Sequence, residues 1–438
     1  MLKTFDLTLI LNGFPLNGAK EHLAGILAIP EQEYEAYINR IKNEIAAYHF
    51  RHNPFYQKIV GTTMPAQWDD LPVLKKTDFQ RPLAERLSKD FTAGNVFINK
   101  TSGSGGEPMT FAKDRFCHAL IWANIIRRFG WYGIDFNHSL QARFYGRSLD
   151  FISNVKLRIK DILSHRHRFD IFDLSDDGLQ KIVAEFGRKK FDYINGYTSC
   201  IVLLAKYLRK HNIILTDICP TLKVCIVTSE MLFDQDVELL VKYLGVPVVN
   251  EYGASELEVI AFENPLSEWT VNAETLFVEI LDEQNKPVAN GTEGKIVVTS
   301  LFNKAHPFIR YEVGDYGILD ESSTAKKPIL KSLTGRTNDV AILPSGKKAP
   351  GMTFYSITKK LFNDDGNVKE FVITQTKTDT FNIEYTSDKE LTPAEISKMK
   401  SIMETYLEPD LQFIFLRKKQ LNRSKSGKLK QFVSLVKQ

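Results

Sequence analysis

Apolar residues recur at intervals of three and four positions between Glu31 and Tyr48. This spacing predicts an amphipathic helix, because residues three or four apart lie on the same face of an α-helix. The apolar face consists of Tyr34, Tyr37, Ile38, Ile41, Ile45 and Tyr48. A second helical pattern runs from Asp114 to Phe129 and is expected to end at Gly130. The sequence therefore predicts that helices dominate the early part of the chain.

Short apolar runs predict strands. Two of them, Leu222–Thr228 and Val246–Asn250, are separated by a helical stretch from Gln235 to Leu244. Continuous apolar strands with a helix between them are typical of a buried βαβ unit in a parallel sheet. An earlier strand, Val96–Lys100, leads directly into a glycine-rich turn. We therefore expect an α/β layer.

Beyond Phe277 the pattern changes to strands punctuated by turns. The runs Leu276–Leu281 and Gly294–Ser300 are strand-like, with Asp282–Asn290 between them. After Asp339 the pattern predicts two strands, a helix and a further strand, at Glu370–Thr374, Thr380–Thr386, Thr392–Leu407 and Gln412–Leu416. These elements predict a compact α+β C-terminal part.

Chain length predicts more than one domain, since 438 residues exceed what one hydrophobic core usually supports. Asp339 is the best candidate for the boundary, which gives domains 1–338 and 339–438. The apolar fraction of 43% and the charged fraction of 25% are typical of soluble globular proteins. A net charge of +4 is too small to predict nucleic-acid binding.

Cysteine usage and the N-terminus bear on the cellular compartment. The four cysteines form no CxxC pair, and the histidines do not fall at zinc-finger spacing, so neither a disulfide framework nor a structural metal is expected. The apolar stretch Leu7–Leu11 is short, and no run approaches the roughly 20 apolar residues of a spanning helix. We expect a cytoplasmic protein without a signal peptide or a transmembrane segment.

Five short polar motifs occur in a fixed order along the chain, and together they outline a nucleotide site. Each is only a few residues long, so the set carries the prediction rather than any one member. They are Thr101-Ser-Gly-Ser-Gly-Gly-Glu-Pro108, Asn250-Glu-Tyr-Gly-Ala-Ser-Glu256, Arg310-Tyr-Glu-Val-Gly-Asp315, Gly335-Arg-Thr-Asn-Asp339 and Ser424-Lys-Ser-Gly-Lys428.

The first motif is a candidate phosphate loop. Hydroxyls and unhindered backbone N–H groups can surround phosphate oxygens where glycine permits close approach. The residues concerned are Thr101, Ser102, Gly103, Ser104 and Gly106. The loop is not a Walker A motif, because it lacks the GK[ST] ending. Taken alone, it could equally be a flexible surface turn.

The whole set resembles the adenylate-forming enzymes, and it is most similar to the branch of phenylacetate-CoA ligases and CapK-type capsule biosynthesis proteins. The runs Thr299-Ser-Leu-Phe-Asn303 and Pro307-Phe-Ile-Arg-Tyr311 match that branch. The resemblance covers nearly the whole chain. It implies an α/β fold with a large N-terminal domain that binds ATP and carboxylate, containing mixed and parallel sheets flanked by helices and a β-rich subdomain. A small, mobile α+β C-terminal domain would follow.

The resemblance also implies roles for single residues. Asn250 and Tyr252 would meet the adenine, Gly253 would belong to the same nucleotide site, and Glu256 would ligate Mg²⁺. Asp315 would accept from the ribose hydroxyls, and Arg336 would place a charge near ribose or phosphate. The alternatives are that Tyr252 is a core aromatic, that Glu256 is a solvated loop acid, and that Asp315 and Arg336 form a structural ion pair.

Lys428 is the first catalytic candidate. The resemblance assigns its ammonium to the substrate carboxylate and the α-phosphate, with Glu256 as the metal-binding catalytic partner and Asp339 as the hinge. Residues 417–438 contain eight Lys or Arg and no acid, so a tail that binds polyanions is the alternative.

The pocket for the organic acid is expected at Tyr145-Gly146 and at Asn195-Gly196-Tyr197. Both segments look equally like turns that cap strands.

The expected reaction is activation of an organic carboxylate with Mg·ATP to an acyl-adenylate and pyrophosphate, followed by acyl transfer to a thiol, coenzyme A by default. Transfer to an amine or a carrier protein is the alternative. A catalytically weak nucleotide-binding scaffold is a second one, because Gly105 replaces the hydroxyl residue usual at that position of the loop. No zinc site is expected, since Val259–Glu274 contains neither Cys nor His. A homodimer is the default assembly for a soluble enzyme.

Overall fold

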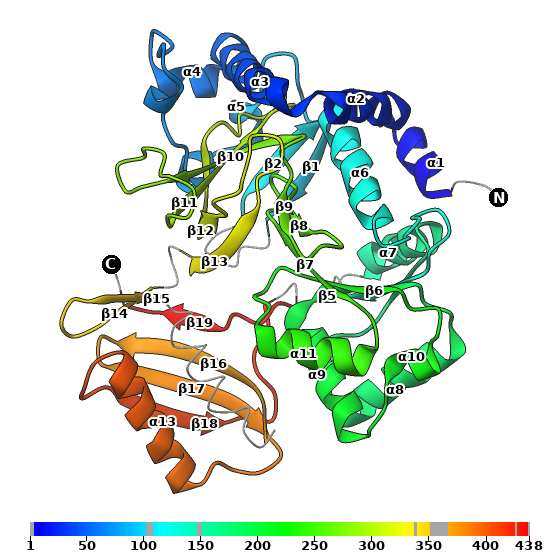
Figure 1. Ribbon diagram of the computed structural model, residues 1–438, viewed down its shortest axis with the longest axis vertical. Helices are drawn as coiled ribbons and strands as arrows, with labels where there is room; N and C mark the ends of the chain where they lie inside the picture. Colours follow the sequence, from blue (N-terminus) through cyan, green and yellow to red (C-terminus); the bar gives the residue numbers. More distant parts are fainter. Residues whose placement is uncertain are drawn as a thin grey trace. The chain divides into compact units, whose positions relative to one another are not determined.

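The computed structural model describes residues 4–101, 108–146, 151–336, 340–350, 367–424 and 427–436. The chain divides into two compact units, one of residues 1–313 with 317–332 and one of residues 314–316 with 333–438. Figure 1 labels the helices and strands along the chain. Among the described residues, no helix is long and apolar enough to cross a membrane.

The larger unit begins with helices. The predicted helix at Glu31–Tyr48 is confirmed and extends to His52, with Tyr34, Ile38 and Ile45 buried. The helices of this unit are α1 (Thr4–Leu11), α2 (Leu16–Ala28), α3 (Glu31–His52), α4 (Pro54–Val60), α5 (Leu83–Arg86), α6 (Arg115–Gly130), α7 (Phe151–Leu163), α8 (Asp176–Arg188), α9 (Thr198–Lys210), α10 (Leu215–Ile218) and α11 (Asp234–Leu244), with 3₁₀ turns at Trp68–Asp70 and Lys76–Phe79.

A mixed sheet lies at the centre of the larger unit, with the strand order β4-β3-β5-β6-β7-β8-β9. The strands from β4 to β7 run parallel, and β8 and β9 pair antiparallel. The predicted βαβ unit is confirmed as β6, α11 and β7, and the α/β class with it. The strands are β3 (Gln141–Phe144), β4 (Arg166–Arg168), β5 (Tyr193–Tyr197), β6 (Val224–Thr228), β7 (Val248–Gly253), β8 (Val259–Glu263) and β9 (Trp269–Val271).

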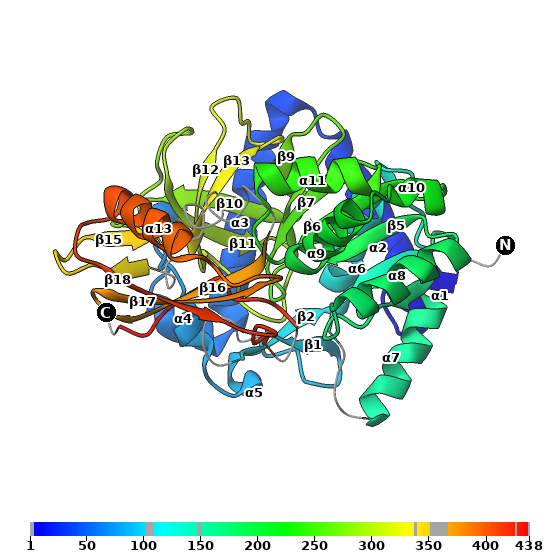
Figure 2. The same ribbon diagram turned by 90° about the horizontal axis from the view of Figure 1, so that it is seen from below.

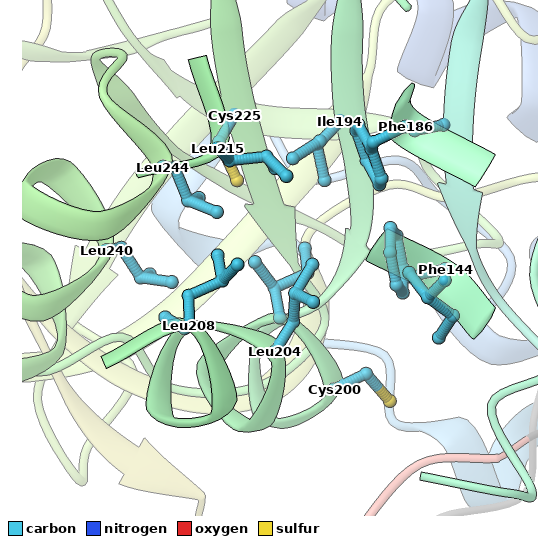
Figure 3. Packing of buried hydrophobic residues seen from close by; sticks show 14 of the residues in the cluster. Phe144, Phe186, Ile194, Cys200, Leu204, Leu208, Leu215, Cys225, Leu240 and Leu244 are labelled. Atoms are coloured by element: carbon cyan, nitrogen blue, oxygen red, sulfur yellow. The ribbon is translucent and has the colours of Figure 1, made fainter. Parts of the chain in front are cut away.

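Each face of this sheet buries its own core, because successive side chains of a strand point to opposite faces. On one face Ile194 and Cys225 pack against the helices α8 to α11. Figure 3 shows the leucines of α9 and α11 that fill this layer, Leu204, Leu208, Leu240 and Leu244. On the other face Tyr193, Val224 and Ile226 pack with residues of α1, α2 and α6. Figure 1 shows these two helix groups on opposite sides of β5, β6 and β7.

Helix α7 continues the α1 and α2 side at the rim of the larger unit. It contacts α1 and the edge strand β4, and Figure 2 shows it near α1 and directed away from the central strands. The segment therefore places its last turn, with Asp161, next to the edge of the sheet.

The strand β1 (Val96–Lys100) is confirmed, and it pairs antiparallel with β2 (Thr110–Asp114). The sequence did not predict β2. Asp114, which the pattern assigned to the start of the helix, ends β2 and caps α6 instead, since its side chain accepts from the Cys117 backbone N–H at 2.8 Å. The glycine-rich motif thus joins two strands of a hairpin.

A four-stranded sheet has the order β10-β11-β12-β13. The predicted strands β10 (Leu276–Leu281) and β11 (Gly294–Ser300) are confirmed as an antiparallel pair. The remaining strands are β12 (Tyr311–Leu319) and β13 (Leu330–Arg336). The motif Arg310–Asp315 therefore covers the start of β12.

The smaller unit has the α+β character that the sequence predicted. Its sheet has the order β18-β17-β16-β19, and α13 (Pro393–Tyr406) is capped by Thr392 and Glu395. The buried Gln375 donates from Nε2 to the Ile342 carbonyl at 2.7 Å, which ties β14 to β16. The strands are β14 (Val340–Ile342), β15 (Lys348–Pro350), β16 (Val368–Lys377), β17 (Thr380–Ser387), β18 (Gln412–Arg417) and β19 (Phe432–Ser434).

All four cysteines lie inside the larger unit. Cys117, Cys200, Cys219 and Cys225 are buried and unpaired by disulfide bonds. Burial raises the pKa of the thiols of Cys117 and Cys225. These side chains therefore act as small apolar groups of the core.

A substitution at Gly196 would test how closely the strands of the parallel sheet pack. A Cβ at this position would lie 2.4 Å from both the carbonyl oxygen and the Cβ of Phe144 on the neighbouring strand. We expect Gly196→Ala to lower the free energy of unfolding by about 1–3 kcal/mol, because the strands cannot separate without losing packing. Urea denaturation measures the change. Gly25→Ala, at an exposed position of helix α2 where nothing lies within 4 Å of the added Cβ, is the control and should stabilise slightly. Equal stability of the Gly196→Ala variant and the wild type would contradict this packing.

Candidate active site

The base of the candidate phosphate loop is fixed by the β1–β2 hairpin. The Thr101 backbone N–H donates to the Met109 carbonyl at 2.9 Å, and the Met109 N–H donates to Thr101 Oγ1 at 2.9 Å. Thr101 therefore closes the loop with both its backbone and its side chain. Ser102, Gly103, Ser104, Gly105 and Gly106 lie outside the described residues.

The second motif forms the end of β7 and the turn into β8. Asn250 and Tyr252 lie on β7, and a bulge separates Tyr252 from Gly253. The Ala254 N–H donates to the Glu258 carbonyl at 3.0 Å, which closes the turn. A Cβ on Gly253 would lie 2.6 Å from the same carbonyl oxygen, so this position requires glycine. The turn thus presents Glu256 at the end of a central strand.

Glu256 is held in place by two other elements. Its Oε1 accepts from the Tyr311 hydroxyl at 2.9 Å, and its side chain is largely buried. From β2, Lys113 donates from Nζ to the carbonyl of the neighbouring Ser255 at 3.1 Å. Burial lowers the pKa of Lys113, while the nearby Cys117 and the carboxylates of Glu258 and Glu256 oppose the shift. Glu256 is therefore not the solvated loop acid that the sequence left as an alternative.

Arg310 fixes the residue that holds Glu256. Its side chain is fully buried, and Nη1 donates to the carbonyls of Asp69 and Leu71 at 3.0 and 2.8 Å. Nη2 lies 3.4 Å from Glu279 Oε1. Sequence reasoning assigned Arg310 no role beyond the motif. An arginine inside the apolar run Pro307–Tyr311 was the available signal, since a buried guanidinium needs several acceptors.

The predicted adenine-binding residues sit on the same strand as the turn. Tyr252 is half-buried, and its ring centroid lies 6.0 Å from that of Trp269 at an interplanar angle of 66°. The Asn250 backbone N–H donates to Glu263 Oε2 at 3.0 Å. Tyr252 is thus only partly covered, unlike the core aromatic of the alternative interpretation.

Other predicted residues belong to the smaller unit. Asp315 is half-buried and follows Gly314, whose φ of 89° favours glycine. Lys428 is half-buried on a turn, in which its backbone N–H donates to Ser424 Oγ at 3.0 Å and the Ser424 N–H donates to the Lys428 carbonyl at 2.9 Å. Arg336 ends β13, and Asp339 lies outside the described residues.

The residues predicted for the acid pocket come together at the carboxyl edge of the parallel strands. The Tyr145 hydroxyl donates to Asn195 Oδ1 at 3.1 Å, and the Tyr145 and Tyr197 ring centroids are 4.9 Å apart. Gly196 faces Phe144, and the Gly146 carbonyl accepts from Arg168 at 3.3 Å. Ligands of open α/β sheets bind at this edge. The two segments are therefore one cluster rather than separate turns.

Two charged residues of this cluster escaped sequence reasoning. The guanidinium of Arg143 lies 4.2 Å from the Tyr145 ring centroid. Burial raises the pKa of Glu251 to about 7, while a hydrogen bond from Thr228 and the charge of Arg143 oppose the shift. Burial also raises the pKa of Tyr145, with Glu251 the next cause. Glu251 lies within the second motif but received no role there, and no local pattern marks Arg143, because strand pairing alone brings the two together.

Metal-binding side chains are sparse in the described part of the chain. Within it, no group of three or more His, Cys, Asp or Glu could hold a metal ion.

Comparison with known proteins places the fold. No family model matches the chain. Protein CapK of Staphylococcus aureus is 21% identical over 335 residues, which cover 72% of this chain and 68% of that protein.

Solved structures match over more of the chain. A 2-hydroxyisobutyryl-CoA ligase in the postadenylation state, in complex with 2-HIB-AMP, matches with a TM-score of 0.70 at 16% identity, covering 93% of this chain and 90% of that chain. The amide bond synthetase McbA from Marinactinospora thermotolerans matches with a TM-score of 0.52 at 13% identity, covering 76% and 68%. The chain thus has the fold of the adenylate-forming ligases, and the fold that its motifs predicted is confirmed.

The raised pKa of Glu251 makes the folding stability of the chain depend on pH. Its pKa in the folded chain, about 7, exceeds the ordinary value of 4.5, so folding binds a proton between these values and stability falls as pH rises through that window. Glu251→Gln removes this penalty. We expect its stability gain over the wild type to be larger at pH 8 than at pH 5 by about 2 kcal/mol in urea denaturation.

The exposed Glu35→Gln on α3 is the matched control for the loss of a carboxyl group. A Glu251→Gln effect that is also independent of pH would refute the raised pKa.

Proposed function

We propose that this chain uses ATP to activate an organic carboxylate as an acyl-adenylate, releasing pyrophosphate, and then transfers the acyl group to the thiol of coenzyme A. The fold likeness to a ligase crystallised with an acyl-AMP supports the reaction class. The observation that carries the proposal is the buried hydrogen bond from Tyr311 to Glu256, because it joins two of the five sequence motifs in one place.

In the first step a carboxylate oxygen attacks the α-phosphorus of ATP, and the bond from that phosphorus to pyrophosphate breaks. The Lys428 ammonium would contact the carboxylate and the α-phosphate, and it would stabilise the charge that builds up in the transition state. Thr101 with the rest of the glycine-rich loop would bind the terminal phosphates. Tyr252 and Asn250 would bind the adenine.

Asp315 would accept hydrogen bonds from the ribose hydroxyls, with Arg336 nearby. In the second step the thiol sulfur attacks the acyl carbon, AMP leaves, and the thiol proton passes to solvent. The proposed mechanism takes residues 1–338 and 339–438 as its two domains. The smaller domain would turn about Asp339 between the two steps.

Glu256 suits Mg²⁺, which prefers carboxylate oxygens as ligands. Tyr311 occupies Oε1, and Oε2 makes no hydrogen bond within the described part of the chain. When bound, Mg²⁺ would neutralise charge on the triphosphate. The chain's own contribution is to fix the carboxylate in advance, through Tyr311 and through the turn that Lys113 supports.

An amine is the second candidate acceptor, because the amide bond synthetase McbA has the same fold. The two acceptors differ in product, since a thioester reacts with hydroxylamine and an ordinary amide does not. Incubation with ATP, an activated acid and either coenzyme A or a panel of amines, followed by mass spectrometry, separates them.

The test of the adenylation step is exchange of labelled pyrophosphate into ATP, measured across aryl, fatty, hydroxy and amino acids. Exchange that depends on a carboxylate is the expected result. Saturable ATP binding without exchange for any acid would overturn the proposal and favour a nucleotide-binding scaffold.

Lys428→Ala should lower the exchange rate by about 10²–10³-fold while ATP affinity changes only a few-fold, because the charge acts mainly in the transition state. Isothermal calorimetry measures the affinity. Lys419→Ala, an exposed lysine of the same basic segment, is the control and should leave exchange unchanged. Equal exchange in Lys428→Ala and the wild type would remove Lys428 from the reaction.

Glu256→Gln should raise the Mg²⁺ concentration for half-maximal exchange by roughly 10-fold or more, because the amide keeps the shape but loses the anionic ligand. A Mg²⁺ titration at saturating ATP measures the shift. Glu35→Gln serves as the control. If the titration curve of Glu256→Gln overlays that of the wild type, Glu256 is not a metal ligand.

A further inference from the structure

Three arginines share one face of the sheet edge formed by β3 and β4. The register pairs Gln141 with Arg166 and Arg143 with Arg168 across these parallel strands. Because residues two apart on a strand point to the same face, Arg143, Arg166 and Arg168 lie side by side. The opposite face carries Ala142 and Phe144, which belong to the apolar core.

Among the residues that the structure describes, only Arg168 of these three has a carboxylate partner. Arg168 donates from Nε and Nη2 to the two oxygens of Asp161 at 2.9 and 3.1 Å. Both oxygens of this acid are therefore hydrogen-bonded to Arg168, although its charge also acts at longer range on Arg143 and Arg166.

Arg143 and Arg166 form no ion pair with any part of the chain that the structure describes. Arg143 donates from Nη1 to Gln141 Oε1 at 3.2 Å and lies against the Tyr145 ring. Arg166 lies 5.9 Å from the Phe5 ring centroid. In both residues Nε is buried and has no hydrogen-bond partner. Two neighbouring guanidinium groups thus keep unused donors.

Such an arrangement is costly without an anion, because partly buried charges are normally paired. Burial lowers the pKa of Arg166 to about 10, with repulsion from Arg143 the next cause. Arg166 still remains charged near neutral pH. Glu251, whose pKa is about 7, offers only a partial negative charge to Arg143. The cluster therefore holds an excess of positive charge.

The cluster adjoins the residues proposed for the acid pocket. Arg143 pairs in register with Asn195 on β5, so the two side chains lie on the same face. Gln141 also donates to Asn195 Oδ1 at 3.1 Å, and Tyr145 donates to the same oxygen. Side chains that are paired in register or hydrogen-bonded thus connect the guanidinium groups of Arg143 and Arg166 with the carboxyl edge of the sheet.

We propose that Arg143 and Arg166 bind a second carboxylate of the substrate, so that the enzyme activates dicarboxylic acids. This substrate is the carboxylate of the proposed function, and the dicarboxylate proposal rests on that function. A guanidinium presents a planar pair of donors that matches a carboxylate. One carboxylate would react at the α-phosphate while the other pairs with the arginines, and Tyr145 would contact the carbon chain between them.

Other substrate classes fit the cluster less well. An amino group at this end of the substrate would be repelled by the two cations. A purely apolar chain would leave both guanidinium groups without an anion, and sites with buried unpaired donors discriminate strongly against such analogues.

The experiment compares matched acids of equal length in pyrophosphate exchange, glutarate against pentanoate and terephthalate against 4-methylbenzoate. We expect kcat/KM of the wild type to favour the dicarboxylate of at least one pair by about 100-fold. Arg143→Gln and Arg166→Gln should each lower that kcat/KM about 10- to 100-fold, and the loss for the dicarboxylate should exceed any loss for the monocarboxylate, so that the preference falls. The exposed Arg188→Gln is the control and should preserve the preference.

Several results would overturn the assignment. A wild type that prefers the monocarboxylate of every pair refutes it without any variant, while the proposed function stands. An equal loss for both acids, with weaker ATP binding, would assign the arginines to the nucleotide instead.

If the wild type activates no acid at all, the proposed function fails. A binding measurement then tests the dicarboxylate site independently of catalysis. Calorimetry with glutarate should then show saturable binding to the wild type that Arg143→Gln weakens at least 10-fold. Absence of binding would reject the site. Thermal unfolding of each variant shows that the loss is not one of folding, and Arg143→Lys, which keeps the charge but not the planar donors, should retain part of the preference.

Discussion

The buried guanidinium of Arg310 is the constraint on which the candidate active site depends. It collects backbone carbonyls from the segment 68–71 and faces Glu279, so the start of β12 cannot shift without exposing a charge to an apolar interior. The next residue is Tyr311, whose hydroxyl holds Glu256. A buried cation therefore sets the position of the candidate metal-binding carboxylate of Glu256 through one peptide unit and one hydrogen bond.

The turn that carries Glu256 is also held from its other side. Lys113 reaches from β2 to the Ser255 carbonyl, and Asn303 holds β2 by donating to the Ala112 carbonyl at 3.0 Å. The hairpin that carries the glycine-rich motif and the turn that carries Glu256 are thus fastened to one another within the larger unit. Some motif residues are placed where they can face a nucleotide. Others, such as Tyr311, hold those residues in position.

Much of the fold could be predicted from local patterns. The helix α3, the unit β6-α11-β7 and the elements β16, β17, α13 and β18 of the smaller unit were found because periodicity and chain order suffice for them, whereas the short strands β14, β15 and β19 were not predicted. The short strand β2 was missed because Thr110–Asp114 mixes polar and apolar residues and runs directly into a helix. The site was less accessible. Tyr145 and Asn195 could be proposed as pocket residues, whereas Arg143, Arg166 and Glu251 acquire meaning only from strand register.

The burial of the thiols has a consequence for an enzyme that would generate a reactive mixed anhydride. Such a molecule acylates any ionised sulfur that it can reach. Here Cys117 and Cys225 stay protonated because burial raises their pKa, and Cys200 and Cys219 are equally sequestered in the core. Burial therefore separates all four thiols from such an activated acyl group, which would protect the chain against acylation of its own sulfur atoms.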